Sequence, residues 1–353
     1  MVVGAFLLFV GLLCYLNFSN MWAVSYHNEG LVISSDIKKI LPKTDPVPPL
    51  DTKAYDQKIL DLANHPFQHT SSSSLATSTK YKWPVKNVYP IAGAILPFKR
   101  IIAYYGNFYS KGMGVLGEYP KEEMIKKLQA EVTKWNEADP TTPVIPAIDY
   151  IASTAQEGPG KQGLYMLRMP DSEIDHALDI AHEINGIVIL DVQVGLSNLQ
   201  KELPLLEKYL IMPDVHLAID PEFSMKTGAR PGTVVGTYDA VDINYAINYL
   251  SKLVQENNLR PKVLIVHRFT QKMVTNYKAI TPTPEVQVVM DMDGWGSPAK
   301  KINTYNTFIT TEPVQFTGFK LFYKNDLKVP STRLLTPGEL LKLQPIPSFI
   351  QFQ

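Results

Sequence analysis

Two carboxylates follow a short apolar run in "VHLAIDPEF" (residues 215–223), where Asp220 and Glu222 flank a proline. The run has the composition of a β-strand, in which successive side chains alternate between two faces. Continued to its end, this strand would place Asp220 and Glu222 on one face, with Cα atoms roughly 6.6 Å apart. At that spacing one carboxylate can hold a proton on the other. A carboxyl group that stays protonated is what general acid catalysis requires.

Seven further apolar runs resemble this one and alternate with helix-like segments. Eight short strands separated by seven helices are typical of parallel βα units, and the number eight predicts a (β/α)8 barrel. No helix follows the last strand, so a short helix expected over residues 51–65, with Asp51 as its cap, would cover that flank. Pro204 would kink the third of the seven helices. The expected strands are residues 100–108, 142–150, 186–195, 215–223, 262–269, 286–296, 316–326 and 347–353, and the expected helices are 120–139, 171–185, 197–210, 239–258, 270–280, 297–309 and 336–344.

Polar residues collect at the C-terminal ends of these strands, which in a barrel meet at one face beneath the long strand-to-helix loops. Because side chains alternate along a strand, either Tyr104 or the pair Tyr105 and Asn107 points into the barrel from the first strand, and the sequence does not decide which. For the seventh strand the same choice is between Lys320 and Tyr323. Six carboxylates end four strands, and such crowding raises their pKa values and is costly unless they bind something. The candidate catalytic residues are Glu222, Asp220, Asp191 and Asp293, and the candidate substrate-binding residues are Tyr104, Tyr105, Asn107, Asp149, Gln193, His267, Asp291, Trp295, Tyr323 and Gln351.

Each of these residues also has an ordinary structural explanation. A single aspartate at a strand end is commonly a helix cap or a turn residue, and Asp293 precedes a glycine, a frequent turn pair. His267 can be a buried histidine satisfied by a neighbour. Their joint occurrence at several strand ends instead favours a site. Paired carboxylates near aromatic rings such as Trp295 indicate glycoside hydrolysis, in which a carboxylic acid protonates the leaving oxygen.

The strands that carry these residues resemble the family 18 glycoside hydrolases, the chitinase-like barrels. "IIAYYGNF" (residues 101–108) is similar to the first strand of that family, and Asp220-Pro221-Glu222 is similar to the end of its fourth-strand motif. "VVMDMDGWG" (residues 288–296) resembles its sixth-strand motif. The resemblance implies a (β/α)8 barrel in which Glu222 is the acid, Asp220 assists it and Asp293 is the sixth-strand carboxylate.

Departures from that pattern keep two other functions open. The earlier acidic positions of the fourth-strand motif are Val215 and Ala218 here, and the tyrosine of the sixth strand is Met292. One alternative is a barrel that binds glycan through its aromatic residues without cleaving it. The other is a metal-dependent hydrolase, with oxygen and nitrogen ligands drawn from Asp149, Asp220, His267 and Asp291.

Composition narrows the class of partner. The 353 residues carry 34 Lys+Arg and 34 Asp+Glu, so the formal net charge is zero, and no basic run or zinc-type spacing indicates nucleic acid. Cys14 is the only cysteine, which excludes a disulfide within the chain. "GPGKQG" (residues 158–163) lacks the spacing of a phosphate-binding loop. The expected partner is therefore a polysaccharide or oligosaccharide, with no cofactor, no metal and no nucleic acid.

The N-terminus predicts export and attachment to a membrane. Residues 2–16, "VVGAFLLFVGLLCYL", are apolar and uncharged, but a complete span takes about 20 such residues. Three interpretations stay open: an uncleaved anchor, a signal peptide, or a lipoprotein modified at Cys14. All three place the rest of the chain outside the cytoplasm, as in a bacterial cell envelope. The expected division is an anchor or signal segment (1–23), a Pro- and Ser-rich tether with a short helix (24–95) and the barrel (96–353).

Overall fold

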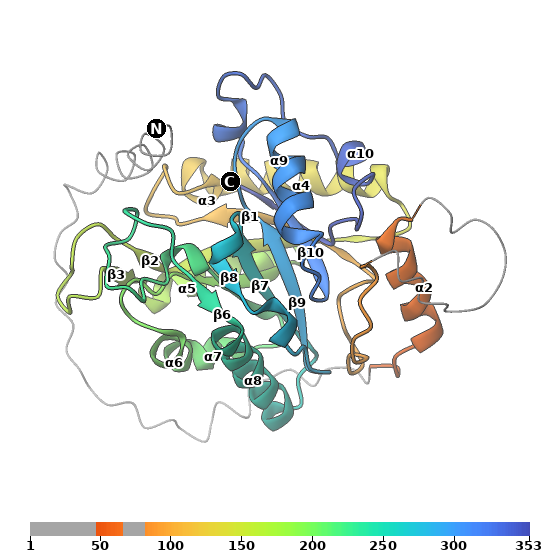
Figure 1. Cartoon of the computed structure of the whole chain (residues 1–353), viewed down its shortest axis with the longest axis horizontal. Coiled ribbons are helices and arrows are strands. Elements are labelled where there is room, and N and C mark those ends of the chain that lie inside the picture. Colours follow the sequence, from red (N-terminus) through yellow and green to blue (C-terminus); the bar gives the residue numbers. More distant parts are fainter. Residues whose placement is uncertain (1–46, 66–81) are drawn as a thin grey trace.

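A computed structural model describes residues 47–65 and 82–353, and its centre is a closed barrel of eight parallel strands (Figure 1). The ring closes because β1 pairs in parallel with both β11 and β2. The predicted (β/α)8 architecture is therefore confirmed. The barrel strands are β1 (Arg100–Gly106), β2 (Val144–Ala155), β4 (Ile187–Val192), β5 (Val215–Ile219), β7 (Lys262–Arg268), β9 (Val286–Met292), β10 (Phe316–Leu321) and β11 (Phe349–Phe352).

Helices follow most of the strands and surround the barrel (Figure 1). Their apolar faces pack on the outward side chains of the strands in one large core. Pro204 breaks the segment after β4 into a short α-helix, a 3₁₀ turn and another short helix, as its missing N–H and fixed φ dictate. The helices of the barrel are α3 (Val115–Glu118), α4 (Lys121–Ala138), α5 (Asp171–Glu183), α6 (Leu199–Glu202), α7 (Glu207–Leu210), α8 (Ala240–Asn257), α9 (Pro298–Thr304) and α10 (Pro337–Leu340).

The helix predicted over residues 270–280 is wrong. The segment instead forms two 3₁₀ turns around β8 (Val274–Thr275), which pairs with β6 (Tyr238–Asp239). Buried Arg268 donates hydrogen bonds to the carbonyl oxygens of Thr270 and Gln271, and Asn276 adopts a left-handed conformation at φ 57°. These contacts take up backbone groups that a helix would use itself, so tertiary context overrides the local pattern.

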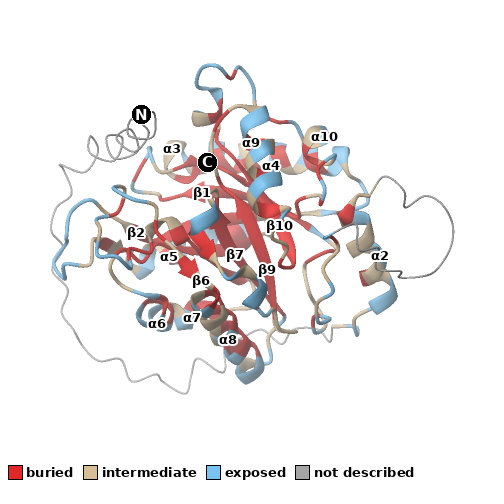
Figure 2. Ribbon diagram, in the orientation of Figure 1, coloured by how far each residue is buried: buried red, intermediate tan, exposed pale blue. Residues whose placement is uncertain are grey.

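Every second side chain of each strand points into the barrel, and these inward side chains form layers that fill it. Inward positions at the N-terminal end and middle are apolar, and Figure 2 shows the strands buried throughout. Gln287 lies inside the N-terminal end, where its Oε1 accepts hydrogen bonds from the backbone N–H groups of Ile95 and Leu96, each at 3.1 Å. This contact holds the apolar loop at residue 96 as the floor of the barrel. Most inward positions of this half are thus apolar, and the carboxyl groups named from the sequence lie at the opposite, C-terminal end.

Helix α2 (Thr52–Ala63) packs against the barrel. Asp51 caps it as predicted, its Oδ1 accepting a hydrogen bond from the Ala54 N–H at 2.9 Å. The carbonyl of Leu62 accepts from the N–H of Ile346, which lies in the segment leading into β11. The described parts of the predicted tether therefore contact the barrel, whereas the predicted anchor (1–23) and the Ser-rich stretch lie outside the described residues. Within residues 47–65 and 82–353, no helix is both long and apolar enough to cross a bilayer.

Tyr55 tests whether α2 is part of the folded domain. Its ring is buried and makes edge-on contacts with Tyr89 and Phe98. Tyr55→Ala is expected to lower the free energy of unfolding by about 3 kcal/mol, because it leaves a cavity in packed apolar surroundings. Urea denaturation of the full chain measures this, with exposed Lys53→Ala as the control. If both variants match the unsubstituted protein, α2 does not stabilise the barrel.

Candidate active site

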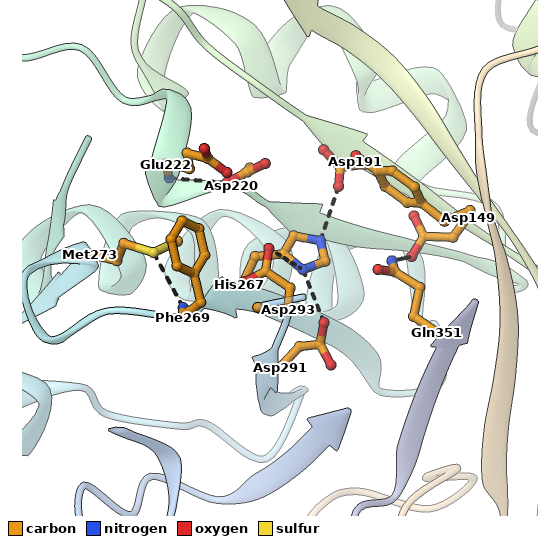
Figure 3. A network of polar contacts seen from close by, with 12 residues as sticks. Asp149, Asp191, Asp220, Glu222, His267, Phe269, Met273, Asp291, Asp293 and Gln351 are labelled. Carbon is orange, nitrogen blue, oxygen red and sulfur yellow. Dashed lines mark hydrogen bonds and ion pairs between the residues drawn. The ribbon is translucent and has the colours of Figure 1, made fainter. Parts of the chain in front are cut away.

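His267, from the C-terminal end of β7, lies at the centre of the polar cluster (Figure 3). Its Nε2 donates to Asp191 Oδ2 at 3.0 Å, and its Nδ1 donates to Asp291 Oδ2 at 3.1 Å. Asp293 Oδ2 lies 3.8 Å from the same Nδ1. Burial disfavours the charged ring, but the hydrogen bonds with Asp191 and Asp291 outweigh it and raise the pKa of His267 well above its usual value. The side chain is therefore an imidazolium held between carboxylates from two strands.

Asp220 and Glu222 lie together at the end of β5, but not on one strand face. The strand ends at Ile219, and Pro221 begins a 3₁₀ turn that Asp220 caps by accepting the Glu222 N–H at 3.0 Å. The strand spacing expected from sequence is wrong because proline fixes φ and supplies no N–H to the ladder. Gly236 packs under this turn, where a Cβ would lie 2.5 Å from the carbonyl oxygen of Pro221. Asp220 is buried, and Glu222 is half-buried at the rim.

The carboxyl groups of this cluster have pKa values shifted upward. Burial, reinforced by the charges of Asp220 and Asp293, raises the pKa of Glu222 well above its usual value. Burial raises the pKa of Asp220 to about 7 and that of Asp293 to about 6, although His267 opposes both shifts. The shift of Glu222 favours its protonated form, whereas Asp293, with a pKa of about 6, is mostly ionised at neutral pH. The cluster thus combines a carboxyl group whose protonated form is favoured with one that is mostly ionised at neutral pH.

Asp149 and Gln351 form the opposite side of the cluster (Figure 3). The Gln351 Nε2 donates to Asp149 Oδ2 at 2.5 Å, and burial together with the charge of Asp191 raises the pKa of Asp149 to about 8. Gly318 lies on β10, between β11 and β9, and a Cβ at this position would lie 2.5 Å from Asp291 Oδ1. The glycine therefore leaves the space that the Asp291 carboxylate occupies.

Lys320 enters the same cluster from β10. Its Nζ lies 3.7 Å from the centre of the Tyr105 ring, and the Tyr105 hydroxyl accepts a hydrogen bond from Gln193 Nε2 at 3.3 Å. The sequence did not decide which residues of β1 and β10 point into the barrel. In the structure Tyr105 and Lys320 do so and belong to the cluster. Sequence reasoning left Lys320 out of the chosen set. The signal that finds it is the inward register of Phe316 and Gly318, four and two residues earlier.

Three predicted substrate-binding residues lie elsewhere. Tyr104 and Tyr323 are on the outside of the barrel, where their hydroxyls are 3.0 Å apart and Tyr323 donates to Glu131. Tyr104 lies there because the register of β1 turns Tyr105 inward, and Tyr323 lies in the turn that follows the end of β10 at Leu321. Asn107 donates to the Ile151 carbonyl and accepts from the Tyr109 N–H, so it shapes the turn after β1. The structure does not support a binding role for these three.

Five oxygen atoms of the cluster are buried and accept no hydrogen bond from any described residue. They belong to five side chains on four strands or the residues that follow them, so they converge from different directions. An acceptor left without a donor in a buried position costs free energy, which a ligand rich in hydroxyl groups would recover. The atoms are Oδ1 of Asp149, Asp191, Asp291 and Asp293, and Oε1 of Gln351.

The donor set does not fit a metal ion. Throughout the described part of the chain, no three His, Cys, Asp or Glu side chains converge as metal ligands would. His267 uses both ring nitrogens as donors to carboxylates, whereas a ligating imidazole needs one nitrogen lone pair. The alternative of a metal-dependent hydrolase therefore gains no support from the geometry.

Asp149 makes the stability of the barrel depend on pH. Its pKa is raised from 3.8 to about 8, so its contribution to stability is present below pH 4 and is lost as the pH rises through 8. Asp149→Asn keeps an acceptor for Gln351 and removes the charge, so the variant should become progressively more stable than the unsubstituted protein between pH 4 and 8, by up to about 1.4 kcal/mol per pH unit. Urea denaturation at several pH values measures this. Exposed Asp179→Asn is the control, and equal curves for the two variants would contradict the prediction.

Comparisons with known proteins return only distant structural matches. No family model and no curated protein matches the sequence, so the resemblance to family 18 is not supported. A solved structure described as the cellulase Cel5C_n has 13% identity and a TM-score of 0.38, over 67% of this chain and 69% of that one. A ruminal GH26 endo-β-1,4-mannanase has 11% identity and a TM-score of 0.34, over 72% and 59%. A D-psicose 3-epimerase in the presence of D-fructose has 15% identity and a TM-score of 0.37, over 72% and 84%.

Proposed function

We propose that this chain hydrolyses glycosidic bonds of a polysaccharide, with Glu222 as the general acid. The observation that carries the proposal is the convergence of six carboxyl groups from four strands at one end of the barrel, around a single imidazolium (Figure 3). That end is where barrel enzymes place their catalytic groups. Glycoside hydrolysis needs a carboxylic acid on one side of the scissile bond and a carboxylate on the other.

Glu222 has the properties of the acid. It lies at the rim, half-buried, and burial together with the neighbouring charges of Asp220 and Asp293 raises its pKa, which favours the protonated form. Protonation of the leaving oxygen transfers this proton and leaves a Glu222 carboxylate. Asp220 fixes the turn that carries Glu222 and is the charge that discourages early ionisation.

Asp293 is the proposed base or stabilising carboxylate. Its pKa of about 6 makes it ionised in the range where Glu222 keeps its proton. It can take a proton from the attacking water or stabilise positive charge at the anomeric carbon. Asp191 and Asp291 hold His267 in place, and their second oxygens are buried with no donor from the described residues. Hydroxyl groups of a bound sugar would supply those donors.

The ionisation of Asp293 predicts a pH profile. We expect kcat/KM to rise as the pH increases through about 6, because the base loses its proton there. Asp293→Asn should remove this rise together with most of the activity. Initial rates between pH 4 and 8 measure it, and an unchanged profile in the variant would assign the base to another group.

The direct test is release of new reducing ends. The purified full chain is incubated with a panel of neutral and acidic polysaccharides, and the products are separated by size. Time-dependent shortening of one polymer is expected. Absence of shortening with every polymer, in a protein that is folded by circular dichroism, would overturn the proposal.

We also propose that the chain acts outside the cytoplasm on a cell-envelope polysaccharide, held at a membrane by its N-terminal segment. The support is the apolar, uncharged stretch at residues 2–16. Fractionation of cells that produce the full chain tests this, since a membrane-bound, externally protease-accessible protein is expected. Recovery in the soluble cytoplasmic fraction would contradict it.

Glycan binding without turnover is the second candidate. It is favoured by the hydrogen bonds of His267, which occupy one oxygen each of Asp191 and Asp291 and so leave fewer carboxylate oxygens for catalysis. Such a protein would bind a glycan through the same buried acceptors and release no product. Measurable affinity for a polysaccharide that stays intact at every pH would establish this alternative.

A further inference from the structure

Trp295 lies on the loop that leaves the C-terminal end of β9, the end of the barrel that carries the carboxylate cluster. It follows Asp293 by two positions, so their Cα atoms are within roughly 7 Å of each other. The indole is partly exposed, on the loop between β9 and α9. A group bound at this ring would therefore lie at the same end of the barrel as the proposed acid and base.

A buried ion pair holds the loop on both sides of this tryptophan. Lys301 Nζ lies 3.0 Å from Asp326 Oδ2 and donates to the Gly294 carbonyl at 2.8 Å. Asp326 Oδ1 accepts the Gly296 N–H at 2.9 Å. Both charged side chains are almost completely buried, so the residues flanking Trp295 are fixed by contacts in the interior. The ring is thus presented from a rigid base.

Two lysines bring positive charge to the ring. Lys300 Nζ lies 5.0 Å and Lys328 Nζ 5.2 Å from the centre of the Trp295 ring system. These distances are within the range of cation–π attraction. Gly296 has φ 146°, and a Cβ there would lie 2.6 Å from Lys300 Cδ. The glycine therefore makes room for the lysine stem that crosses it.

The charge at this spot differs from that of the neighbouring cluster. The cluster consists mainly of carboxyl groups, whereas the two ammonium groups at Trp295 come from separate segments, α9 and the loop after β10, and meet at one ring. Both lysines are exposed. Two converging ammonium groups beside an aromatic surface match a sugar that carries an anionic substituent.

We propose that Trp295, Lys300 and Lys328 form a subsite for an acidic sugar unit, so that the substrate is an anionic polysaccharide. This inference rests on the proposed glycosidase function, because the subsite lies at the end of the barrel that carries Glu222 and Asp293. The ring contacts the apolar face of the sugar, and the ammonium groups bind its carboxylate or sulfate. The subsite selects the polymer, while the buried cluster supplies the acid and the base.

Binding is measured with polymers that differ only in charge. Affinity electrophoresis of the full-length Glu222→Gln variant compares polygalacturonate with its fully methyl-esterified form, and dextran sulfate with dextran. The first pair tests a carboxylate and the second a sulfate. Added to Glu222→Gln, Lys300→Gln and Lys328→Gln should each weaken binding of an anionic polymer two- to fivefold, as for exposed ion pairs, and the loss should shrink at high salt. Trp295→Ala should weaken it further, and Trp295→Phe less.

Lys272→Gln is the matched control, since Lys272 is an exposed lysine after the neighbouring strand β7. It should leave binding unchanged. Equal binding of charged and neutral polymers, or an equal loss from Lys272→Gln, would overturn the subsite. Hydrolysis can be measured in proteins that keep Glu222. If such a protein hydrolyses a neutral polymer, and if Lys300→Gln and Lys328→Gln leave this rate unchanged, the subsite is overturned but the glycosidase proposal stands. Charge-selective binding lost in the lysine variants, without hydrolysis of any polymer, would support the subsite and refute the hydrolase.

Discussion

Glu222→Gln should lower kcat for polysaccharide hydrolysis by about 10²–10⁴-fold, the contribution of a positioned general acid. The amide has nearly the shape of the carboxyl group but no transferable proton at any working pH. The backbone N–H of residue 222 is unaffected, so its hydrogen bond to Asp220 and the turn after β5 should persist. Because the lost interaction belongs to the transition state, KM should change much less than kcat. Initial rates over a range of substrate concentrations separate the two parameters.

Glu137→Gln is the matched control for this substitution. Glu137 is exposed near the end of α4, and its replacement should leave kcat unchanged. A substrate with a better leaving group needs less help from an acid, so it should lose less activity in Glu222→Gln. If the variant keeps full activity on the natural polymer, Glu222 does not protonate the leaving oxygen.

His267→Gln should destabilise the barrel by about 3–5 kcal/mol, as when one partner of a buried ion pair is removed. Asp191 and Asp291 would keep their buried positions but lose the positive charge between them. The loss should be largest near pH 6. The stabilisation from this histidine is complete below its unfolded pKa of about 6.5 and falls as the pH rises through the raised folded pKa. Urea denaturation at pH 6 and pH 8 measures both effects.

His182→Gln provides the comparison at the surface. His182 Nε2 lies 2.6 Å from Asp214 Oδ2, but the histidine side chain is 59% exposed. Solvent screens such a pair, so the cost should stay below about 1 kcal/mol. If the two histidine variants lose equal stability, His267 is not the charge that compensates the carboxylates of the cluster.

The strands were predictable because short apolar runs alternate along this chain with segments of helical periodicity. All eight expected strands are present, and a run such as residues 262–269 is close to β7. The absence of a helix at residues 270–280 was not predictable from periodicity, since contacts with Arg268 and β6 decide that segment. Asp191, Asp220, His267 and Asp291 were also found from sequence, because strand ends of a closed parallel barrel must meet.

Where polar and aromatic residues alternate along a strand, the sequence did not predict which of them face the interior of the barrel. Tyr104 and Tyr105 are adjacent, and only closure of the ring between β11 and β2 places the second one inside. The same holds for Lys320 and Tyr323. A one-residue shift exchanges the two faces of a strand, so local pattern cannot choose between neighbours of similar character.

The sequence by itself determined that this chain forms a (β/α)8 barrel with acidic residues at the ends of its strands, because periodicity and strand order are properties of the chain. Tertiary structure decided which side chains share the interior and how each one is ionised. Burial and charges from strands far apart in the sequence make His267 a shared cation and favour the protonated form of Glu222. Ionisation in a buried site depends on distances that exist only after folding.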